Sequence, residues 1–184
     1  MPDCSPQPPP EASIRTARTK DVRGIRALVA PLAERRLLLN KEAVAYYETI
    51  GDFVVAERDG RIVGCGALHV LWEDLAEIRT LAVADSQRRT GLGSRLLEHL
   101  VARAEDLGVA RLFCLTFETS FFTEHGFEAI DGQAVEPEVY AELLRSYDEG
   151  VAEFLDLERV KPNTLGNTRM LRVLHPVTGT TTPP

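Results

Sequence analysis

The segment Leu81–Ser94, with the sequence LAVADSQRRTGLGS, contains the feature that decides the fold. An apolar run typical of a buried strand leads into a basic loop with two glycines, and a helix is predicted to begin directly behind it. Backbone amides at the start of a helix bind phosphate groups, and glycines let a ligand approach the backbone closely. Arg88 and Arg89 add positive charge at the same place. Taken alone, the loop predicts either a phosphate site or a basic turn in which glycine supplies a positive φ.

The chain around this loop has the size and composition of one soluble globular domain. It has 184 residues, of which 44% are hydrophobic and 27% are charged. Its net charge of −7 argues against a nucleic-acid or membrane partner, because both would need a broad basic face. No apolar run approaches the roughly 20 residues of a membrane span. The three cysteines, Cys4, Cys65 and Cys114, have neither zinc-site nor disulfide-framework spacing, so we expect no metal and a cytoplasmic location.

The two ends of the chain differ in composition from the middle. Five of the eleven prolines lie in the first ten residues, and the last ten residues are rich in threonine and proline. Such stretches do not sustain a helix or a strand ladder. We therefore predict flexible tails at residues 1–11 and 175–184, and a single domain over residues 12–174.

Within the domain, apolar spacing alternates between the periods of strands and of helices. Strands are expected at Ser13–Arg18, Phe53–Glu57, Arg61–Val70, Ala76–Val83, Arg111–Phe117 and Met170–Leu174. Helices are expected from an N-cap at Thr19 through Leu32, at Lys41–Ile50, at Ser94–Leu107 and at Thr119–His125. Pro137–Phe154 is helix-prone, and Leu155–Asn167 is expected to be a loop. This order predicts an α/β fold with a mixed sheet.

The predicted strand Ala76–Val83 carries a second candidate site. Strand alternation places Glu77, Arg79, Leu81 and Val83 on one face. Amines are protonated near neutral pH, and a nearby carboxylate can remove that proton directly or through a water, so Glu77 is a candidate general base. Arg79 can hold the carboxylate of an acceptor by a bidentate pair. The alternative for both residues is a salt bridge with each other.

Together these motifs resemble the GNAT superfamily of N-acetyltransferases. The resemblance lies in Arg88-x-x-Gly91-x-Gly93 behind a Leu-Ala-Val strand, in the glutamate of that strand and in the element Phe121–Phe127, and it covers most of the domain. It implies the GNAT acyl-CoA N-acyltransferase fold, with helices on a central twisted sheet, and acetyl-CoA as co-substrate. A dinucleotide-binding fold fits less well, because its fingerprint has three glycines in GxGxxG and an acidic residue after the next strand.

The resemblance also implies roles for individual residues. The pyrophosphate of coenzyme A is expected at the loop residues Arg88, Arg89, Thr90, Gly91, Leu92, Gly93 and Ser94. The backbone of Leu81, Ala82 and Val83 is expected along the pantetheine, with the Leu81 N–H as oxyanion donor. Phe122 stands where many GNAT enzymes have a tyrosine that protonates the departing thiolate. Thr116 then carries the nearest candidate hydroxyl, unless it is only a β-branched strand residue.

A narrower resemblance, to the N-acetylglutamate synthases, rests on longer segments. Cys65–Leu68, Ala76–Val83 and Arg111–Thr116 are similar to their acetyltransferase domain, and Lys161–Leu171 is similar to the C-terminal motif of short actinobacterial members. The resemblance implies acetylation of the α-amino group of glutamate, the first step of arginine biosynthesis. The short members lack the arginine-sensing kinase-like domain, so feedback through such a domain is not expected.

The acceptor glutamate would need cations and amide groups around it. The candidates are Lys41, Arg79, Lys161, Asn163, Asn167 and Arg169. A surface position is the alternative for Lys161, and a solvated helix end is the alternative for Lys41. Two other functions stay open: acetylation of another amine, such as glutamine or a peptide or protein amine, and a non-catalytic CoA-binding module. The expected partners are small molecules, and a homodimer is expected by analogy alone.

Overall fold

The computed structural model describes residues 11–39, 41–157 and 166–174. Within these ranges seven strands form one sheet in the order β1-β2-β3-β4-β5-β7-β6. The strands are β1 (Ser13–Thr16), β2 (Phe53–Arg58), β3 (Arg61–Trp72), β4 (Leu75–Val83), β5 (Arg111–Thr116), β6 (Glu128–Ala129) and β7 (Thr168–Val173). Only β4 and β5 pair in parallel, and every other pairing is antiparallel. The prediction of an α/β fold with a mixed sheet is confirmed.

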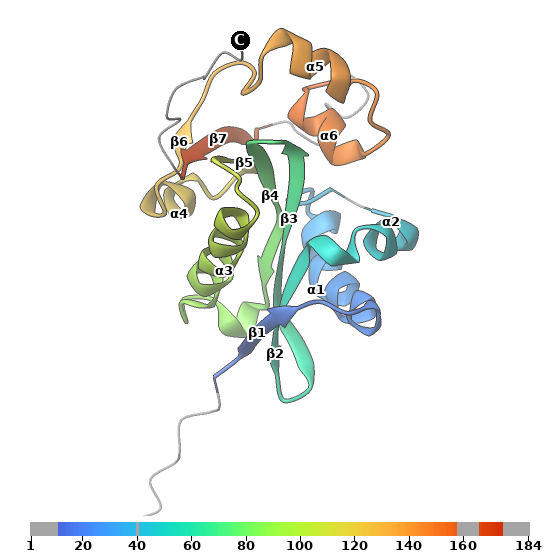
Figure 1. Cartoon of the computed structure of the whole chain (residues 1–184). Coiled ribbons are helices and arrows are strands. Elements are labelled where there is room, and N and C mark those ends of the chain that lie inside the picture. Colours follow the sequence, from blue (N-terminus) through green and yellow to red (C-terminus); the bar gives the residue numbers. More distant parts are fainter. Residues whose placement is uncertain (1–10, 40, 158–165, 175–184) are drawn as a thin grey trace, which may run out of the picture.

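Helices cover both faces of the sheet (Figure 1). They are α1 (Val22–Glu34), α2 (Ala43–Glu48), α3 (Leu92–Asp106), α4 (Thr119–Glu124), α5 (Pro137–Leu143) and α6 (Glu149–Phe154). Figure 1 shows α3 on one face, α1 and α2 on the other, and α5 and α6 beyond the end of the sheet where β5 and β7 lie. No helix in the described ranges is long and apolar enough to cross a membrane.

The helices are held by their apolar faces, as the helical spacing predicts. Leu96, Leu97 and Leu100 of α3 are fully buried against one face of the sheet, and the α1 face that includes Ile25 is buried against the other. A third apolar cluster joins α6 to β5. In that cluster the rings of Phe113 and Phe154 meet edge to face, with centroids 4.9 Å apart. Helix α6 is therefore fixed to the sheet beside β4 and β5.

Some elements differ from the prediction. The helix-prone segment Pro137–Phe154 divides into α5 and α6, because the Asp148 side chain accepts the Val151 N–H and begins a new helix. The two-residue strand β6 was not predicted. Most of the expected loop Leu155–Asn167, and nearly all of both expected tails, lies outside the described residues. Glu11 is described, and its carboxylate pairs with Arg95 at 2.7 Å.

Strand β4 carries one extra residue relative to β3. Ala67 pairs with Arg79 and Cys65 pairs with Ala82, so Thr80 and Leu81 together lie opposite the one residue between, Gly66. Thr80 has a φ of 54°, in the left-handed region that a threonine rarely adopts. This geometry is a β-bulge.

The bulge corrects the prediction that Glu77, Arg79, Leu81 and Val83 share one face. Leu81 and Val83 pack against the core on the α3 side of the sheet, and Ile78 belongs to the same core. Because side chains alternate, Glu77 and Arg79 point to the opposite face. The extra residue at the bulge reverses the alternation, which a pattern of period two cannot anticipate.

Beyond Glu77, strand β4 separates from β5. The two strands pair only over Leu75–Glu77 and Arg111–Phe113, while β5 continues its pairing with β7 as far as Thr116. In the described part of the chain, the later residues of β4 therefore have a ladder partner on one side only. Their remaining backbone groups are available to a ligand with amide groups of its own.

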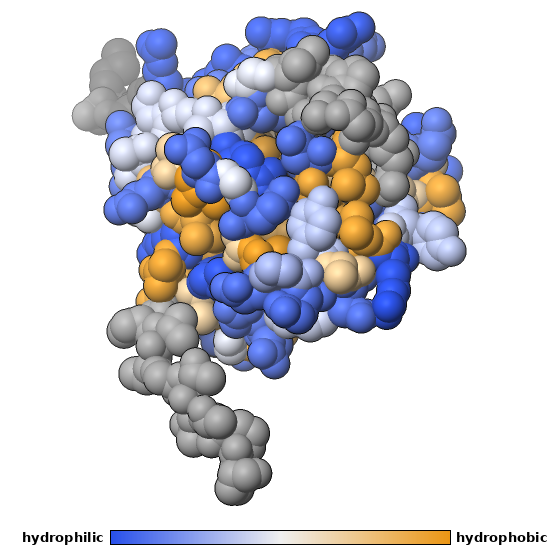
Figure 2. Space-filling model, turned by 90° about the horizontal axis from the view of Figure 1, so that it is seen from above, coloured by the Kyte–Doolittle hydropathy of each residue, from blue (hydrophilic) through white to orange (hydrophobic). Residues whose placement is uncertain are grey.

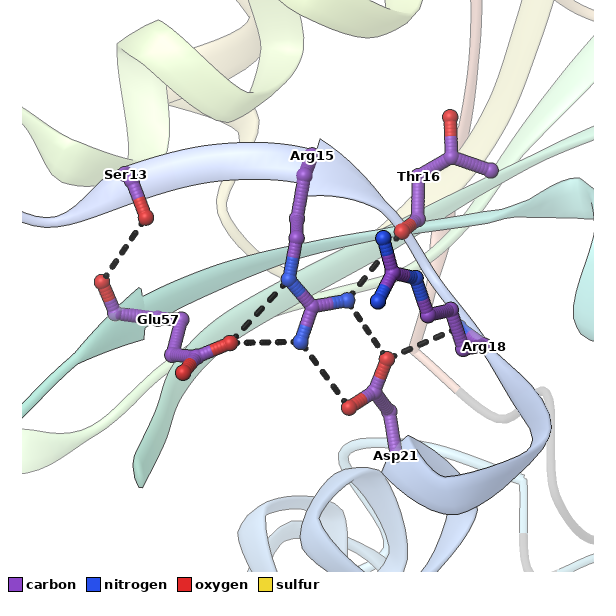
Figure 3. Close-up of polar contacts among 6 residues, drawn as sticks. All are labelled: Ser13, Arg15, Thr16, Arg18, Asp21 and Glu57. Atoms are coloured by element: carbon purple, nitrogen blue, oxygen red, sulfur yellow. Dashed lines mark hydrogen bonds and ion pairs between the residues drawn. The ribbon is translucent and has the colours of Figure 1, made fainter. Parts of the chain in front are cut away.

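A charged network joins β1, β2 and the start of α1 (Figure 3). The chain enters α1 through a 3₁₀ turn at Thr19–Asp21, so Thr19 is not the N-cap that the sequence predicted. Asp21 instead accepts the Arg18 backbone N–H at 2.8 Å and both terminal nitrogens of Arg15 at 2.6 and 3.0 Å. The Arg15 Nε also donates to Glu57 at 3.0 Å. The Asp21 carboxyl is buried, and its bonds to Arg15 hold its pKa below the usual value near 3.8.

We expect Asp21→Asn to lower the free energy of unfolding by about 1–3 kcal/mol, because it removes a buried, charged acceptor of three hydrogen bonds. A carboxyl whose pKa is lowered by folding stabilises the fold above its unfolded pKa and loses that effect as the pH falls. The free energies of unfolding of wild type and variant, measured with denaturant, should therefore approach each other below about pH 4. Glu57→Gln, at the more exposed end of the network, should cost about 1 kcal/mol or less. Equal losses at pH 7 and pH 3 would contradict this account.

Candidate active site

A small cavity lies where the Glu77 face of β4 meets α6 and the segment before α2. Its volume is about 60 Å³. The apolar side is formed by Leu37, Leu38, Leu39, Ile78 and Leu115, and the polar lining consists of Lys41, Glu77, Arg79, Thr80, Glu153 and Asn167. Four residues predicted as acceptor or catalytic groups, Lys41, Glu77, Arg79 and Asn167, are therefore brought together here.

The centre of this cavity wall is a buried arginine between two carboxylates. Arg79 Nε donates to Glu77 Oε2 at 2.6 Å, and Arg79 Nη1 pairs with Asp148 Oδ1 at 2.9 Å. Glu77 is 3% exposed and Arg79 is 9% exposed. The predicted salt bridge between Glu77 and Arg79 thus exists, and it uses only the Nε of the guanidinium. Burial alone would lower the pKa of Arg79, but the two carboxylates outweigh it and the pKa is raised.

Among the described residues, two buried polar atoms of the lining have no hydrogen-bond partner. They are Nη2 of Arg79 and Oδ1 of Asn167. Buried polar groups are nearly always hydrogen-bonded, so one orphan donor and one orphan acceptor beside one cavity point to a ligand. Such a ligand would offer an acceptor, such as a carboxylate, to Arg79, and an N–H donor to Asn167.

The pKa of Lys41 is shifted by burial and by the charged groups around the cavity. Burial is the main cause that lowers the pKa of Lys41, and the positive charge of Arg79 adds to it. Asp148, Glu77 and Glu153 act in the opposite direction without cancelling the effect. A negative group of a ligand placed between Lys41 and Arg79 would stabilise both cations.

Arg169 lies beside the cavity and not in its lining. Its guanidinium donates to the carbonyl oxygens of Gly132 and Phe154 at 3.0 and 2.8 Å, and it lies over the Phe113 ring at 4.9 Å. These contacts anchor β7 to α6. A direct contact of Arg169 with the acceptor stays a prediction. Lys161 and Asn163 lie outside the described residues.

Thr116 ends strand β5 and is buried. Its Oγ1 accepts the Glu118 backbone N–H at 2.9 Å, which leaves its own proton available for donation. Phe122 packs edge to face with the rings of Phe121 and Phe127. Phe122 is therefore a core residue, and the thiolate-protonating role of Thr116 stays a prediction.

The glycine loop has the geometry of an anion-binding turn. Arg89 and Gly91 have φ values of 62° and 80°, and Gly91 is the N-cap of α3. No side chain caps this 15-residue helix, and its first backbone bond, from Arg95 to Gly91, leaves the N–H groups of residues 92–94 without an acceptor in the helix. Arg88 is exposed and pairs with Asp85 at 3.0 Å. The loop therefore offers unpaired amides, the helix dipole and nearby arginines to a phosphate.

The residues of β4 that were predicted to contact the coenzyme lie between this loop and the cavity. Leu81 and Val83 belong to the part of β4 that has lost β5 as a partner. Leu81 follows the bulge directly, and Ala82 faces the opposite core. Strand β4 therefore runs from the cavity at Arg79 to the glycine loop. Between these two places its backbone pairs with β3 and no longer with β5.

Sequence reasoning missed the contribution of α6. Asp148, Gly150 and Glu153 all border or support the cavity, and none was predicted as a site residue. An acidic residue before a short helix signals an N-cap, but nothing local in the sequence indicates a contact with a strand about 70 residues earlier. In the described ranges no group of three or more His, Cys, Asp or Glu residues is arranged to hold a metal ion.

Comparison with known proteins identifies the family of this chain. The profile of the acetyltransferase (GNAT) family matches residues 34–127. The chain belongs to the GNAT acetyltransferase family. An amino-acid acetyltransferase of Mycobacterium tuberculosis is 51% identical over 175 residues, which are 94% of this chain and 97% of that relative. The predicted family and fold are thereby confirmed, and the chain is an acyltransferase.

Two solved relatives of this GNAT chain contain coenzyme. The structure of Rv2747 from Mycobacterium tuberculosis in complex with CoA and NLQ has a TM-score of 0.85 and 52% identity, covering 89% of this chain and 99% of that one. The N-acetylglutamate synthase of Neisseria gonorrhoeae, in complex with CoA and N-acetyl-glutamate, has a TM-score of 0.72 and 29% identity. The match covers 92% of this chain and 36% of that longer chain. Acetyl-CoA as the co-substrate agrees with both.

We expect Gly93→Ala to raise the KM for acetyl-CoA several-fold while leaving Tm unchanged or higher. A Cβ at this position would meet only the Phe121 ring, at 3.6 Å, so the fold itself does not require glycine, and alanine favours the helix. Gly108→Ala is the opposite control. Gly108 follows the far end of α3 and has a φ of 79°, which alanine adopts only with strain, so this variant should lower Tm without changing the KM. Steady-state kinetics and thermal unfolding measure both. An unchanged KM in Gly93→Ala would show that the coenzyme does not approach this amide.

Proposed function

We propose that this chain transfers the acetyl group of acetyl-CoA to the α-amino group of L-glutamate, the reaction of an N-acetylglutamate synthase and the first step of arginine biosynthesis. The observation that carries the proposal is the unpartnered Nη2 of Arg79, which is buried beside a cavity that Lys41 and Glu77 also line. Arg79 matches a carboxylate of the acceptor, Lys41 matches a second anionic group, and Glu77 matches the ammonium. The named activities of two relatives, amino-acid acetyltransferase and N-acetylglutamate synthase, support the same acceptor class.

The proposed reaction is direct transfer within a ternary complex. Glu77 takes a proton from the acceptor ammonium, and the free amine nitrogen then attacks the thioester carbonyl carbon. The N–H of Leu81 stabilises the oxyanion of the tetrahedral intermediate. The intermediate collapses with cleavage of the C–S bond as its nitrogen loses a second proton, and that proton reaches the CoA thiolate through the Thr116 hydroxyl, which donates one proton and accepts the other. The products are the N-acetyl amino acid and CoA.

Glutamine is a second acceptor candidate, because the cavity lining contains Glu153 as well as Lys41. A side-chain amide can present its carbonyl oxygen to the lysine and its N–H groups to the carboxylate, whereas the carboxylate of glutamate pairs with the lysine as a full charge. A peptide or protein amine fits a cavity of about 60 Å³ less well. A CoA-binding module without catalysis would leave Glu77 without a chemical role.

The acceptor is tested by comparing kcat/KM for glutamate, glutamine and aspartate, with a short peptide as a fourth substrate, in an assay of thiol release. We expect glutamate to be preferred by at least ten-fold, because one lost charge contact costs about that factor. A higher kcat/KM for glutamine would identify glutamine as the acceptor in place of glutamate. Turnover of the peptide alone would reject an amino-acid acceptor.

We expect Glu77→Gln to lower kcat by about 100-fold or more near neutral pH, as the loss of a general base does. Acetyl-CoA binding, measured by calorimetry, should remain close to wild type. The deficit should shrink as the pH approaches the pKa of the acceptor amine, because a free amine no longer needs a base. A deficit of the same size at every pH would assign Glu77 a purely structural role. Glu142→Gln, an exposed acid paired with Arg145, is the matched control and should retain full activity.

The remaining expectations belong to the same proposal. A cytoplasmic location is supported by Cys65 and Cys114, which are buried free thiols. Burial raises the pKa of Cys65 to about 12, so this thiol is unsuited to act as a nucleophile. A homodimer, and the lack of a nucleic-acid or membrane partner, remain predictions. Viewed from the end that carries α5 and α6, the described residues expose apolar groups in several separate areas between hydrophilic ones (Figure 2).

A further inference from the structure

We propose that Asp148 is a positioning residue of the acceptor cavity, which holds the Arg79 guanidinium so that its free nitrogen faces the acceptor. Asp148 lies in the connection between α5 and α6, and neither the fold family nor the sequence motifs assign it a role. The inference deepens the proposed function, since it rests on an amino-acid acceptor at this cavity. It follows from three contacts that fix Arg79 and one that is missing.

Two of these contacts are made by nitrogens of the guanidinium with carboxylates. Nε donates to Glu77 at 2.6 Å and Nη1 pairs with Asp148 at 2.9 Å, so the two carboxylates approach the arginine from different directions. A guanidinium is a rigid planar fork, and two fixed nitrogens determine where the third one points. The third nitrogen is Nη2, which is buried and has no hydrogen-bond partner in the part of the chain that the structure describes. With Glu77 as its only partner, the guanidinium could turn about the Nε contact, and the direction of Nη2 would not be fixed.

The third contact lies on the face of the guanidinium. A Cβ built on Gly150 would fall 2.5 Å from Arg79 Cζ, so the backbone of α6 lies directly against the planar group. Any side chain at position 150 would displace Arg79 or α6. Asp148 and Gly150 therefore restrict the same arginine through two different contacts.

Helix α6 is anchored well enough to transmit this restriction. Asp148 Oδ1 accepts the Val151 N–H at 2.8 Å, and Val151, Phe154 and Leu155 are buried in the cluster that includes Phe113 of β5. The Asp148 carboxylate thus connects the first turn of α6, which is packed into this cluster, to Arg79 on β4. Burial raises the pKa of Asp148, but Arg79 and the Val151 N–H lower it further, so the net pKa is below the usual value and the ion pair persists at neutral pH.

The test separates the capping role of Asp148 from its contact with Arg79. Asparagine and serine both cap helices. Asp148→Asn keeps the cap and a neutral polar contact with Arg79, whereas Asp148→Ser keeps the cap with a side chain too short for that contact. We expect Asp148→Ser to raise the KM for the amino-acid acceptor at least ten-fold, with a smaller change in kcat and an unchanged KM for acetyl-CoA. Asp148→Asn should fall between the serine variant and wild type.

A second variant keeps the proposal falsifiable if Asp148→Ser does not fold. Gly150→Ala retains Asp148 and the cap but moves the guanidinium, and it should also raise the acceptor KM without affecting acetyl-CoA. An acceptor KM within two-fold of wild type in the folded variants would overturn the proposal. So would a parallel rise in both KM values that follows the loss of Tm, since that result indicates a structural role alone.

The outcome remains distinct from a failure of the proposed function. If the wild-type protein acetylates no amino acid, the proposed function is wrong, and Asp148 is then judged from a crystal structure of Asp148→Ser. An Arg79 guanidinium that keeps its orientation on Glu77 in that crystal would overturn the positioning role. A rotated guanidinium, with Glu77 in place, would support it.

Discussion

Strand β4 has to present functional groups to two opposite faces of one sheet, and a single extra residue makes that possible. Glu77 and Arg79 face the acceptor cavity, whereas Leu81 and Val83, after the bulge opposite Gly66, pack on the α3 side. The left-handed φ of Thr80 costs about 1–3 kcal/mol, which the flanking strand pairs must offset. Without this bulge the regular alternation would place the proposed base Glu77 and the predicted coenzyme-binding residues Leu81 and Val83 on one face.

The separation of β4 from β5 adds the second constraint. Pairing ends at Glu77, so the backbone beyond it is one-sided as it runs toward the phosphate loop at the start of α3. The buried charge of Arg79 lies close to where the pairing ends, and burying a charge is costly unless it is compensated. Glu77 and Asp148 compensate it from two elements far apart in the sequence. The acceptor cavity is therefore held together by the same ion pairs that orient its groups.

Much of this arrangement was accessible from residue patterns. Helix α3, the strands of the central sheet and the glycine loop follow from apolar periodicity and turn chemistry, which act within a few residues of one another. Glu77 and Arg79 were predicted as a pair of candidates with two competing roles. The structure combines those roles, because the salt bridge uses Nε of Arg79 and leaves Nη2 unpartnered.

The sequence by itself determined the GNAT family, and it predicts a phosphate loop at Arg88–Ser94 and the residue types of the proposed site, since each depends on local spacing. Only the tertiary structure decided the faces of β4 and the contribution of α6. The bulge depends on the register between β3 and β4, and the contact of Asp148 with Arg79 joins residues about 70 positions apart. Register and long-range ion pairs are set by the packing of whole elements, which no short stretch of sequence records.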